Sequence, residues 1–130
     1  MCTILIIDDD SEFLQLMRAA LKDEGYNVLS ASSGPKGLDM LRYAPSPVRV
    51  VLLDFDMPKL NGAETLNFLR RLNPHSKVVA VTGMSPNFLP GDFRDGVDHT
   101  IYKPFQMADL VALIHRMVLT YPALTARAVV

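Results

Sequence analysis

Short apolar runs alternate with longer amphipathic segments along almost the whole of this sequence, and the alternation narrows the possible folds sharply. Runs of five or six apolar residues are typical of strands buried on both faces; they span 3–7, 26–31, 48–53, 77–81 and 98–102. Between them, apolar residues recur every three or four positions, which predicts helices. We therefore expect an α/β fold, a parallel sheet with helices on both faces, because strand–helix–strand crossovers share one hand.

Capping residues predict where the helices begin and end. Asp10 or Ser11 can accept free amide protons at the start of the first helix, and Gly25 suits its end. The other helices are expected to begin near Gly34-Pro35, near Asn61 or Gly62, and to span 107–120.

The segment from Met84 to Asp95 does not fit the alternation. Pro86, Pro90 and Gly91 interrupt it, and an interior proline removes a helical hydrogen bond and clashes with the preceding turn. We expect one short turn of helix or an irregular loop there.

Composition indicates one domain of ordinary globular character. The chain has 130 residues, a formal net charge of −1 and a single cysteine, Cys2. That charge provides no basic field for nucleic acid, one cysteine excludes an internal disulfide, and no apolar stretch could span a bilayer. We expect a cytoplasmic domain over residues 1–121 with a short C-terminal tail over 122–130, and neither direct nucleic-acid binding nor membrane contact. The protein is either stand-alone or one piece of a longer chain.

Polar residues stand where the expected strands end. Asp8 and Asp9 follow the first strand, Asp54 the third, Thr82 the fourth and Lys103 the fifth. The carboxyl ends of parallel strands meet at one edge of the sheet, where open α/β sheets bind ligands. Three carboxylates at close range repel each other unless a pKa rises or a cation binds. Oxygen ligands of this kind suit Mg²⁺.

A hydroxyl and an ammonium group across from the acids suit a phosphoryl group, whose charge needs hydrogen-bond donors and cations around it. A carboxylate can itself be the nucleophile. The residues therefore predict metal-assisted phosphoryl transfer onto an aspartate. Spacing does not say which one. Asp54 is favoured because it stands alone on the central strand, whereas Asp8 and Asp9 are adjacent and better placed to hold the ion.

These residues, taken in order, closely resemble the receiver domain of two-component response regulators. The motifs are Asp8-Asp9, Asp54 with Met57-Pro58 and Gly62 after it, Thr82-Gly83, and Lys103-Pro104-Phe105. The resemblance covers about residues 3–120, and five such motifs in order are far more specific than any one alone. It implies a flavodoxin-like, doubly wound, five-stranded parallel sheet of order 2-1-3-4-5.

The resemblance also implies roles in phosphoryl transfer. Asp54 matches the phosphoacceptor, and Thr82 and Lys103 match the residues that grip the phosphoryl oxygens. Lys103-Pro104 matches a bond that is often cis. The implied donor is a phosphohistidine on a sensor histidine kinase or a histidine phosphotransfer protein. The implied output is a protein-interaction surface read by an unknown downstream protein, and a homodimer is left open. Such a domain is not an enzyme beyond its own phosphorylation and dephosphorylation.

A metal site is implied in the same way. Asp8 and Asp9 match the acidic pair, with Asp9 the direct ligand of Mg²⁺ (or Mn²⁺). Asp54 completes the carboxylates, and Asp56 matches the residue whose backbone carbonyl also binds the ion.

Three features depart from the family pattern. Thr100 stands where the family usually has a Tyr or Phe whose rotamer changes on phosphorylation. The aromatic residue of this switch is therefore absent, or Tyr102 or His99 replaces it. Residues 84–95 are expected to be mobile or irregular, which would change the output surface. The side chain of Asp56 adds a carboxylate near the path of the hydrolytic water, and we expect it to affect the lifetime of the phosphorylated state.

Two alternatives stay open at this point. Asp54-Phe55-Asp56 also looks like the DxD motif of haloacid-dehalogenase-type phosphatases, although Met57-Pro58 follows it and the acidic pair lies on a separate strand. A degenerate receiver would act only as an interaction module. The three histidines show no metal-ligand spacing; they are His75, His99 and His115.

Overall fold

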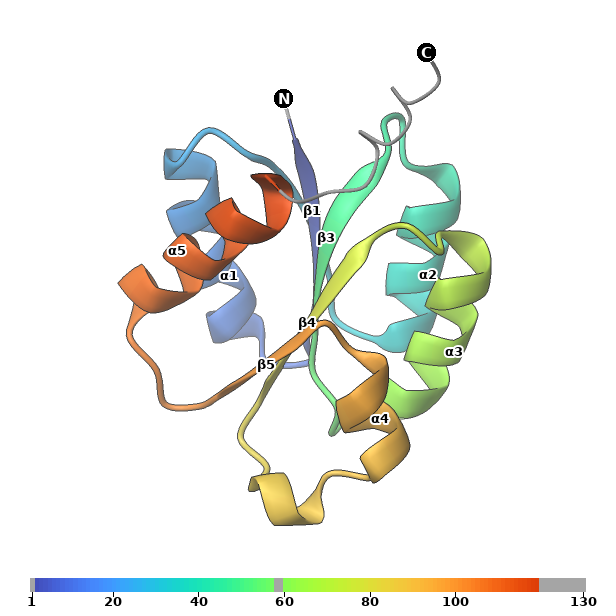
Figure 1. The fold of residues 1–130 in the computed structure, drawn as a ribbon. Helices are drawn as coiled ribbons and strands as arrows, with labels where there is room; N and C mark the ends of the chain where they lie inside the picture. Colours follow the sequence, from blue (N-terminus) through green and yellow to red (C-terminus); the bar gives the residue numbers. More distant parts are fainter. Residues whose placement is uncertain (1, 58–59, 120–130) are drawn as a thin grey trace.

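A computed structural model describes residues 2–57 and 60–119, and it has a central sheet between two layers of helices (Figure 1). In chain order the elements are β1 (Thr3–Ile7), α1 (Ser11–Asp23), β2 (Asn27–Ala31), α2 (Gly34–Tyr43), β3 (Val48–Leu53), α3 (Gly62–Leu72), β4 (Lys77–Thr82), the 3₁₀ helix η1 (Pro86–Phe88), α4 (Gly91–Gly96), β5 (His99–Tyr102) and α5 (Met107–Leu119). The strands are parallel, in the order β2-β1-β3-β4-β5. This order confirms the flavodoxin-like prediction, and each expected strand is present to within one residue at either end.

Helices cover both faces of the sheet, as Figure 1 shows, with α1 and α5 on one face and α2, α3 and α4 on the other. Alternate residues of the central strands point to opposite layers. Ile4 and Ile6 of β1 pack beneath α1 and α5, whereas Leu5 and Ile7 pack beneath α2 and α3. Burial on both faces explains why these strands are continuously apolar in sequence.

The predicted ends of α1 and the predicted start of α3 are also confirmed. Asp10 caps α1, because its side chain accepts hydrogen bonds from the backbone amides of the second and third helical residues. Gly25 follows α1 with a φ of +94°, a conformation that favours glycine. Asn61 caps α3 in a reciprocal capping box with Glu64.

The segment before β5 forms two short helical pieces, η1 and the six-residue α4. Leu89 and Phe93 anchor it in the core beneath α3, while Phe88 is 74% exposed. The sequence predicts one short turn of helix or an irregular loop here, and the structure has two short helical pieces instead of one. The expected mobility of this segment stays a prediction.

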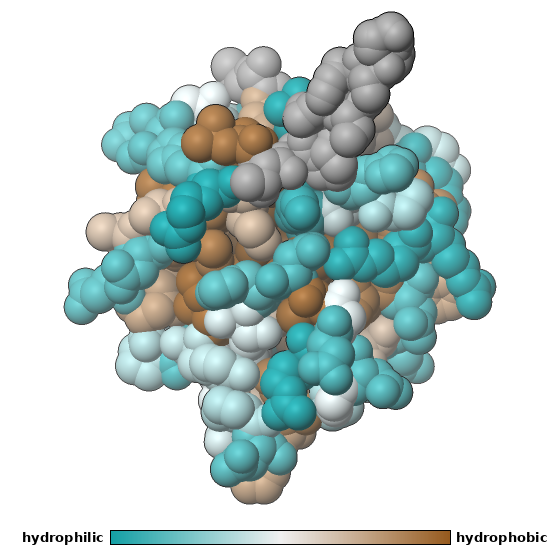
Figure 2. Space-filling view, viewed as in Figure 1, coloured by the Kyte–Doolittle hydropathy of each residue, from teal (hydrophilic) through white to brown (hydrophobic). Residues whose placement is uncertain are grey.

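The view in Figure 2 shows a surface on which hydrophilic side chains predominate, with hydrophobic ones scattered between them. Over residues 2–57 and 60–119, no helix has the length and apolar character needed to cross a bilayer. Three of the predictions lie outside the described residues: the tail over 122–130, the end of the last helix at Thr120 and the motif residue Pro58.

Candidate functional site: an acidic pocket at the carboxyl edge of the sheet

Sheet hydrogen bonds continue one residue past the strands and hold the candidate site residues at the edge. The backbone amides of Asp8 and Asp54 donate to carbonyl groups of β2 and β1, at 3.1 and 3.0 Å. The amide of Lys103 donates to the carbonyl of Thr82 at 2.8 Å. The peptide bond between Lys103 and Pro104 is cis, as the resemblance implied.

Three carboxylates converge at this edge. Asp8, Asp9 and Asp54 each offer an oxygen, and these oxygens lie within 4.8 Å of one another. Asp8 and Asp54 are buried, with 2% and 7% of their surfaces exposed, whereas Asp9 faces solvent. The acidic pocket defined by these residues therefore has two buried acids and one open side.

Burial makes negative charge costly in the acidic pocket. It raises the pKa of Asp54 to about 6, with the neighbouring Asp8 carboxylate adding to the rise and the Lys103 ammonium group opposing it. Burial also raises the pKa of Asp8, although hydrogen bonds from the Asp10 backbone and from Lys103 partly lower it. A bound cation would relieve the cost in both cases.

Lys103 completes the pocket. Its Nζ lies 3.0 Å from Asp8 Oδ2, while Asp8 Oδ1 accepts the backbone amide of Asp10 at 3.0 Å. The same Nζ lies 4.2 Å from the centroid of the Phe13 ring. Sequence reasoning did not identify Phe13, because a ring on α1 and a lysine after β5 meet only through the fold.

Thr82 is fully buried at the end of β4. Its Oγ1 accepts a hydrogen bond from the backbone amide of Met84 at 3.1 Å. This contact uses the oxygen as an acceptor, so the hydroxyl proton can still be donated to a group at the sheet edge.

Gly62 holds the loop after β3 in place. Its amide donates to the carbonyl of Phe55 at 2.8 Å. A Cβ at this position would lie 2.5 Å from Phe55 Cα and 2.7 Å from the Asp54 carbonyl oxygen, too close for any side chain. The motif glycine is therefore required by the close approach of α3 to the chain that carries Asp54.

The side chain of Asp56 is exposed beside the acidic pocket. The Asp56 backbone also makes a hydrogen bond to the Asp54 carboxylate, which lowers the pKa of Asp54 and so opposes the effect of burial. Asp56 is thus coupled to Asp54 through the backbone, with its own carboxylate free to face solvent.

The donor set of the acidic pocket fits a hard divalent cation. Its ligand atoms are carboxylate oxygens on three residues, and one side is open to the water molecules that Mg²⁺ usually retains. Raised pKa values for the two buried acids are expected as long as no cation neutralises the cluster.

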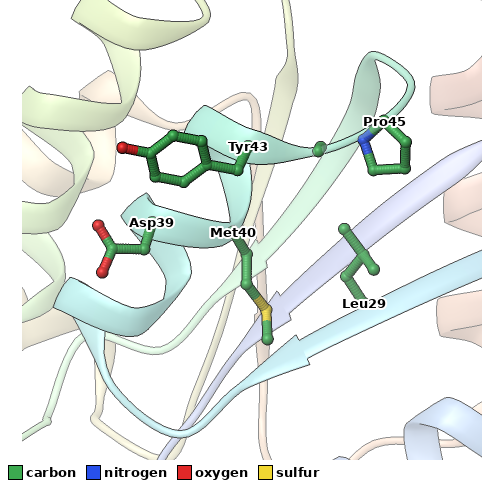
Figure 3. A pocket seen from close by; sticks show the side chains of 6 residues that line it. Leu29, Asp39, Met40, Tyr43 and Pro45 are labelled. Atoms are coloured by element: carbon green, nitrogen blue, oxygen red, sulfur yellow. The ribbon is translucent and has the colours of Figure 1, made fainter.

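An apolar hollow elsewhere on the molecule is separate from this chemistry. It lies between α2 and β2, near the loop that leads to β3 (Figure 3), and its lining residues are Leu29, Asp39, Met40, Tyr43, Ala44 and Pro45. None of these belongs to the acidic pocket, which lies at the opposite, carboxyl ends of the strands.

The histidines take no part in the pocket either. His75 and His99 are exposed, and His115 on α5 makes contacts with Tyr26 and Glu24 instead.

This fold and this pocket together define a class of protein. Its members are domains that accept a phosphoryl group on an aspartate at the edge of a parallel sheet. The sequence matches the family described as "Response regulator receiver domain" over residues 4–115. The chain therefore belongs to the response regulator receiver domain family. It is a phosphoacceptor receiver domain for phosphorelay signalling, with an acidic pocket formed by Asp8, Asp9 and Asp54. This assignment favours the receiver over the phosphatase alternative, and such a domain implies a cognate histidine kinase.

Known relatives agree with this assignment. The chain is 35% identical to the transcriptional regulatory protein CpxR of Escherichia coli over 111 residues, 85% of this chain and 47% of the relative. A receiver domain from Clostridium thermocellum is 30% identical, with a TM-score of 0.81, and the match covers 95% of this chain and 99% of that one. The response regulator TrrA from Thermotoga maritima, solved in complex with Mg(2+)-BeF, is 24% identical, with a TM-score of 0.78 and coverage of 90% and 99%. The chain spans about half the length of the curated relatives it matches.

Proposed function

We propose that Asp54 is the phosphoacceptor of this receiver domain. The observation that carries the proposal is that Asp54 is a buried carboxylate at the end of the central strand, with two further acids and a lysine around it. Its carboxylate oxygen attacks the phosphorus of a phosphohistidine; the P–N bond breaks, a P–O bond forms, and the electron pair leaves with the imidazole. The donor belongs to a sensor histidine kinase or a histidine phosphotransfer protein.

Thr82 and Lys103 hold the transferred group. The Lys103 ammonium group turns from Asp8 Oδ2 to a phosphoryl oxygen, and the Thr82 hydroxyl donates its proton to another. Asp8, Asp9, Asp54 and the backbone carbonyl of Asp56 hold Mg²⁺ or Mn²⁺. When bound, that cation neutralises the phosphoryl and carboxylate oxygens. The fit of the three carboxylates to a hard cation supports this assignment, and so does the Mg(2+)-BeF complex of the relative TrrA.

The test is phosphorylation by acetyl phosphate with Mg²⁺, followed by intact-mass analysis. The wild-type chain gains one phosphoryl group and Asp54→Asn gains none, whereas Asp39→Asn, an exposed acid on α2, behaves like wild type. A phosphatase would instead turn over many donor molecules, and a degenerate receiver would gain no phosphate. Either result would refute the proposal.

We propose that Tyr102 takes the place of the aromatic residue usual at position 100, and that it passes the change on phosphorylation to the surface read by a downstream protein. Thr100 and Tyr102 are two residues apart on β5, so both point to the same face of the sheet. Tyr102 packs in the core layer beneath α3 and α4, whereas His99 is exposed. NMR chemical shifts of residues 84–95, measured with and without phosphorylation, test this role. Shift changes that vanish in Tyr102→Leu would support it. Shift changes that persist in Tyr102→Leu would refute it.

The remaining proposals concern the whole protein. We infer a cytoplasmic domain over residues 1–121 that signals to a downstream protein, with neither direct DNA contact nor membrane contact of its own. The net charge of −1 and the single cysteine support this setting. A homodimer stays compatible with it.

A further inference from the structure

The ring of Phe13 lies against the ammonium group of Lys103, and the proposed function does not use this contact. Lys103 Nζ is 4.2 Å from the ring centroid, well inside the range of a cation–π interaction. The same Nζ is 3.0 Å from Asp8 Oδ2. The ammonium group is therefore held between a carboxylate and the face of an aromatic ring.

Phe13 is held at its backbone and at its ring. On α1, the backbone amide of Phe13 donates to the capping carboxylate of Asp10 at 3.2 Å. The ring of Phe105, two residues after Lys103, packs edge-on against the Phe13 ring, with centroids 6.1 Å apart and planes at 84°. Phe13 is thus anchored both at the start of α1 and by the segment that carries Lys103.

Such an anchor matters because lysine is a flexible, strongly hydrated side chain. The Lys103 side chain is 26% exposed, so water competes for its ammonium group. A ring face on one side and Asp8 on the other restrict that group to the pocket.

We propose that Phe13 is a positioning residue for phosphoryl transfer: its ring holds Lys103 Nζ at the pocket, ready for the oxygens of the incoming phosphoryl group. The inference rests on the proposed roles of Asp54 and Lys103. It requires no covalent step beyond the one already described.

The rate of phosphorylation tests the role directly. Phe13→Leu removes the ring, and we expect the rate with acetyl phosphate and saturating Mg²⁺ to fall about three- to tenfold, the range expected for a partly solvated cation–π contact. Phe13→Tyr keeps a ring face and should restore most of the rate. Phe68→Leu is the matched control, because it removes a half-exposed ring on α3, far from the pocket.

A second readout separates positioning from a merely structural effect. Protons above the face of an aromatic ring resonate upfield, so the ε-methylene protons of Lys103 should be shifted upfield in the unphosphorylated wild type. We expect ordinary lysine values in Phe13→Leu and upfield values in Phe13→Tyr and Phe68→Leu. The Lys103→Arg variant lacks the ε-methylene protons of Lys103, so the signal that disappears in this variant is assigned to them.

The outcomes distinguish this inference from the proposed function. A wild-type rate in Phe13→Leu, or Lys103 signals that do not move, overturns the role of Phe13 while leaving Asp54 as the acceptor. Failure of the wild-type chain to gain any phosphate overturns the proposed function and this inference together. A lowered rate in Phe13→Leu, rescue by Phe13→Tyr and the matching shift in the signals establish the role.

Discussion

The carboxylate of Asp54 is buried, has a second buried acid beside it and has a pKa of about 6. Its folded pKa lies above its usual value of 3.8, so the folded chain binds the proton more tightly than the unfolded chain does. The stability that this proton contributes is complete below about pH 4 and is lost as the pH rises through about 6. At neutral pH the ionised Asp54 therefore destabilises the metal-free fold.

This argument predicts that Asp54→Asn stabilises the metal-free protein at pH 7.5, by on the order of 1–3 kcal/mol in the free energy of unfolding. The amide has nearly the same shape and carries no charge to bury. Urea unfolding with chelator at pH 7.5 and at pH 4 measures the effect, and the gain should largely vanish at pH 4. A variant that is less stable than wild type at pH 7.5 would show that Asp54 is not under electrostatic strain.

The exposed carboxylate of Asp56 leads to a prediction about the lifetime of the phosphorylated state. It lies two residues after Asp54 and faces solvent, from where the hydrolytic water must come. A carboxylate there can accept a hydrogen bond from that water and assist its attack. We expect Asp56→Asn to lengthen the lifetime roughly two- to tenfold, since its exposure limits the assistance well below that of a buried base.

Decay of the phosphorylated form, followed by intact mass after removal of the donor, measures this lifetime. Asp92→Asn, an exposed acid on α4, serves as the matched control and should decay like wild type. Unchanged decay in Asp56→Asn would mean that its carboxylate plays no part in hydrolysis, and faster decay would mean that the carboxylate hinders the water instead of assisting it.

Among the elements, the short α4 depends on a neighbour for support. Arg70 of α3 donates to the carbonyls of Ser76 and Gly96, at 2.8 and 3.0 Å, and to Asp98 Oδ2 at 3.1 Å. The same Asp98 oxygen accepts the amide of Val78 at 2.7 Å. Arg70 thereby ties the end of α3 to the start of β4 and to the end of α4.

We predict that Arg70→Ala lowers the free energy of unfolding by about 1–3 kcal/mol, because hydrogen bonds to a charged group are lost and their partners lie partly buried. Amide hydrogen exchange over residues 91–98 should rise more than exchange elsewhere. Arg71→Ala is the control, since Arg71 is exposed and only approaches the Phe68 ring, at 5.9 Å. Equal effects from the two variants would leave Arg70 without a special role.

The same elements show what the sequence could predict and what it could not. Continuous apolar runs predicted the five strands, because strands buried on both faces need no alternation. Asp54, Thr82 and Lys103 were predicted together at one edge, because each follows its own strand. The contact between Phe13 and Lys103 and the bonds of Arg70 join residues far apart in the chain, and no local pattern encodes them. The roles of the site residues remain predictions that the tests above address.

At the scale of the whole molecule, the acidic pocket is joined to both helical layers. Lys103 contacts Phe13 of α1 in one layer. On the other side, Phe55 follows Asp54 and packs against Phe93 of α4, with ring centroids 5.0 Å apart. The acidic pocket therefore reaches side chains of both helical layers, through Lys103 on one side and through Phe55, the neighbour of Asp54, on the other.

The last prediction concerns the response of the whole fold to a divalent cation. We expect Mg²⁺ to bind the folded chain and not the unfolded one, so it should stabilise the protein by about 1–3 kcal/mol at concentrations ten to a hundred times its dissociation constant. Protons compete for the same carboxylates, and the pKa of Asp54 is about 6. The increase in melting temperature should therefore be large at pH 8 and small at pH 5.

Melting curves with MgCl₂, compared with NaCl at equal ionic strength, measure this response. Asp9→Asn and Asp54→Asn each remove one of the three carboxylates and should lose most of it, whereas Asp39→Asn on α2 should keep it. Because Asp9 is exposed, Asp9→Asn removes a proposed metal ligand without disturbing the core. If Asp9→Asn responds to Mg²⁺ as strongly as wild type, the cation binds elsewhere and the acidic pocket is not its site.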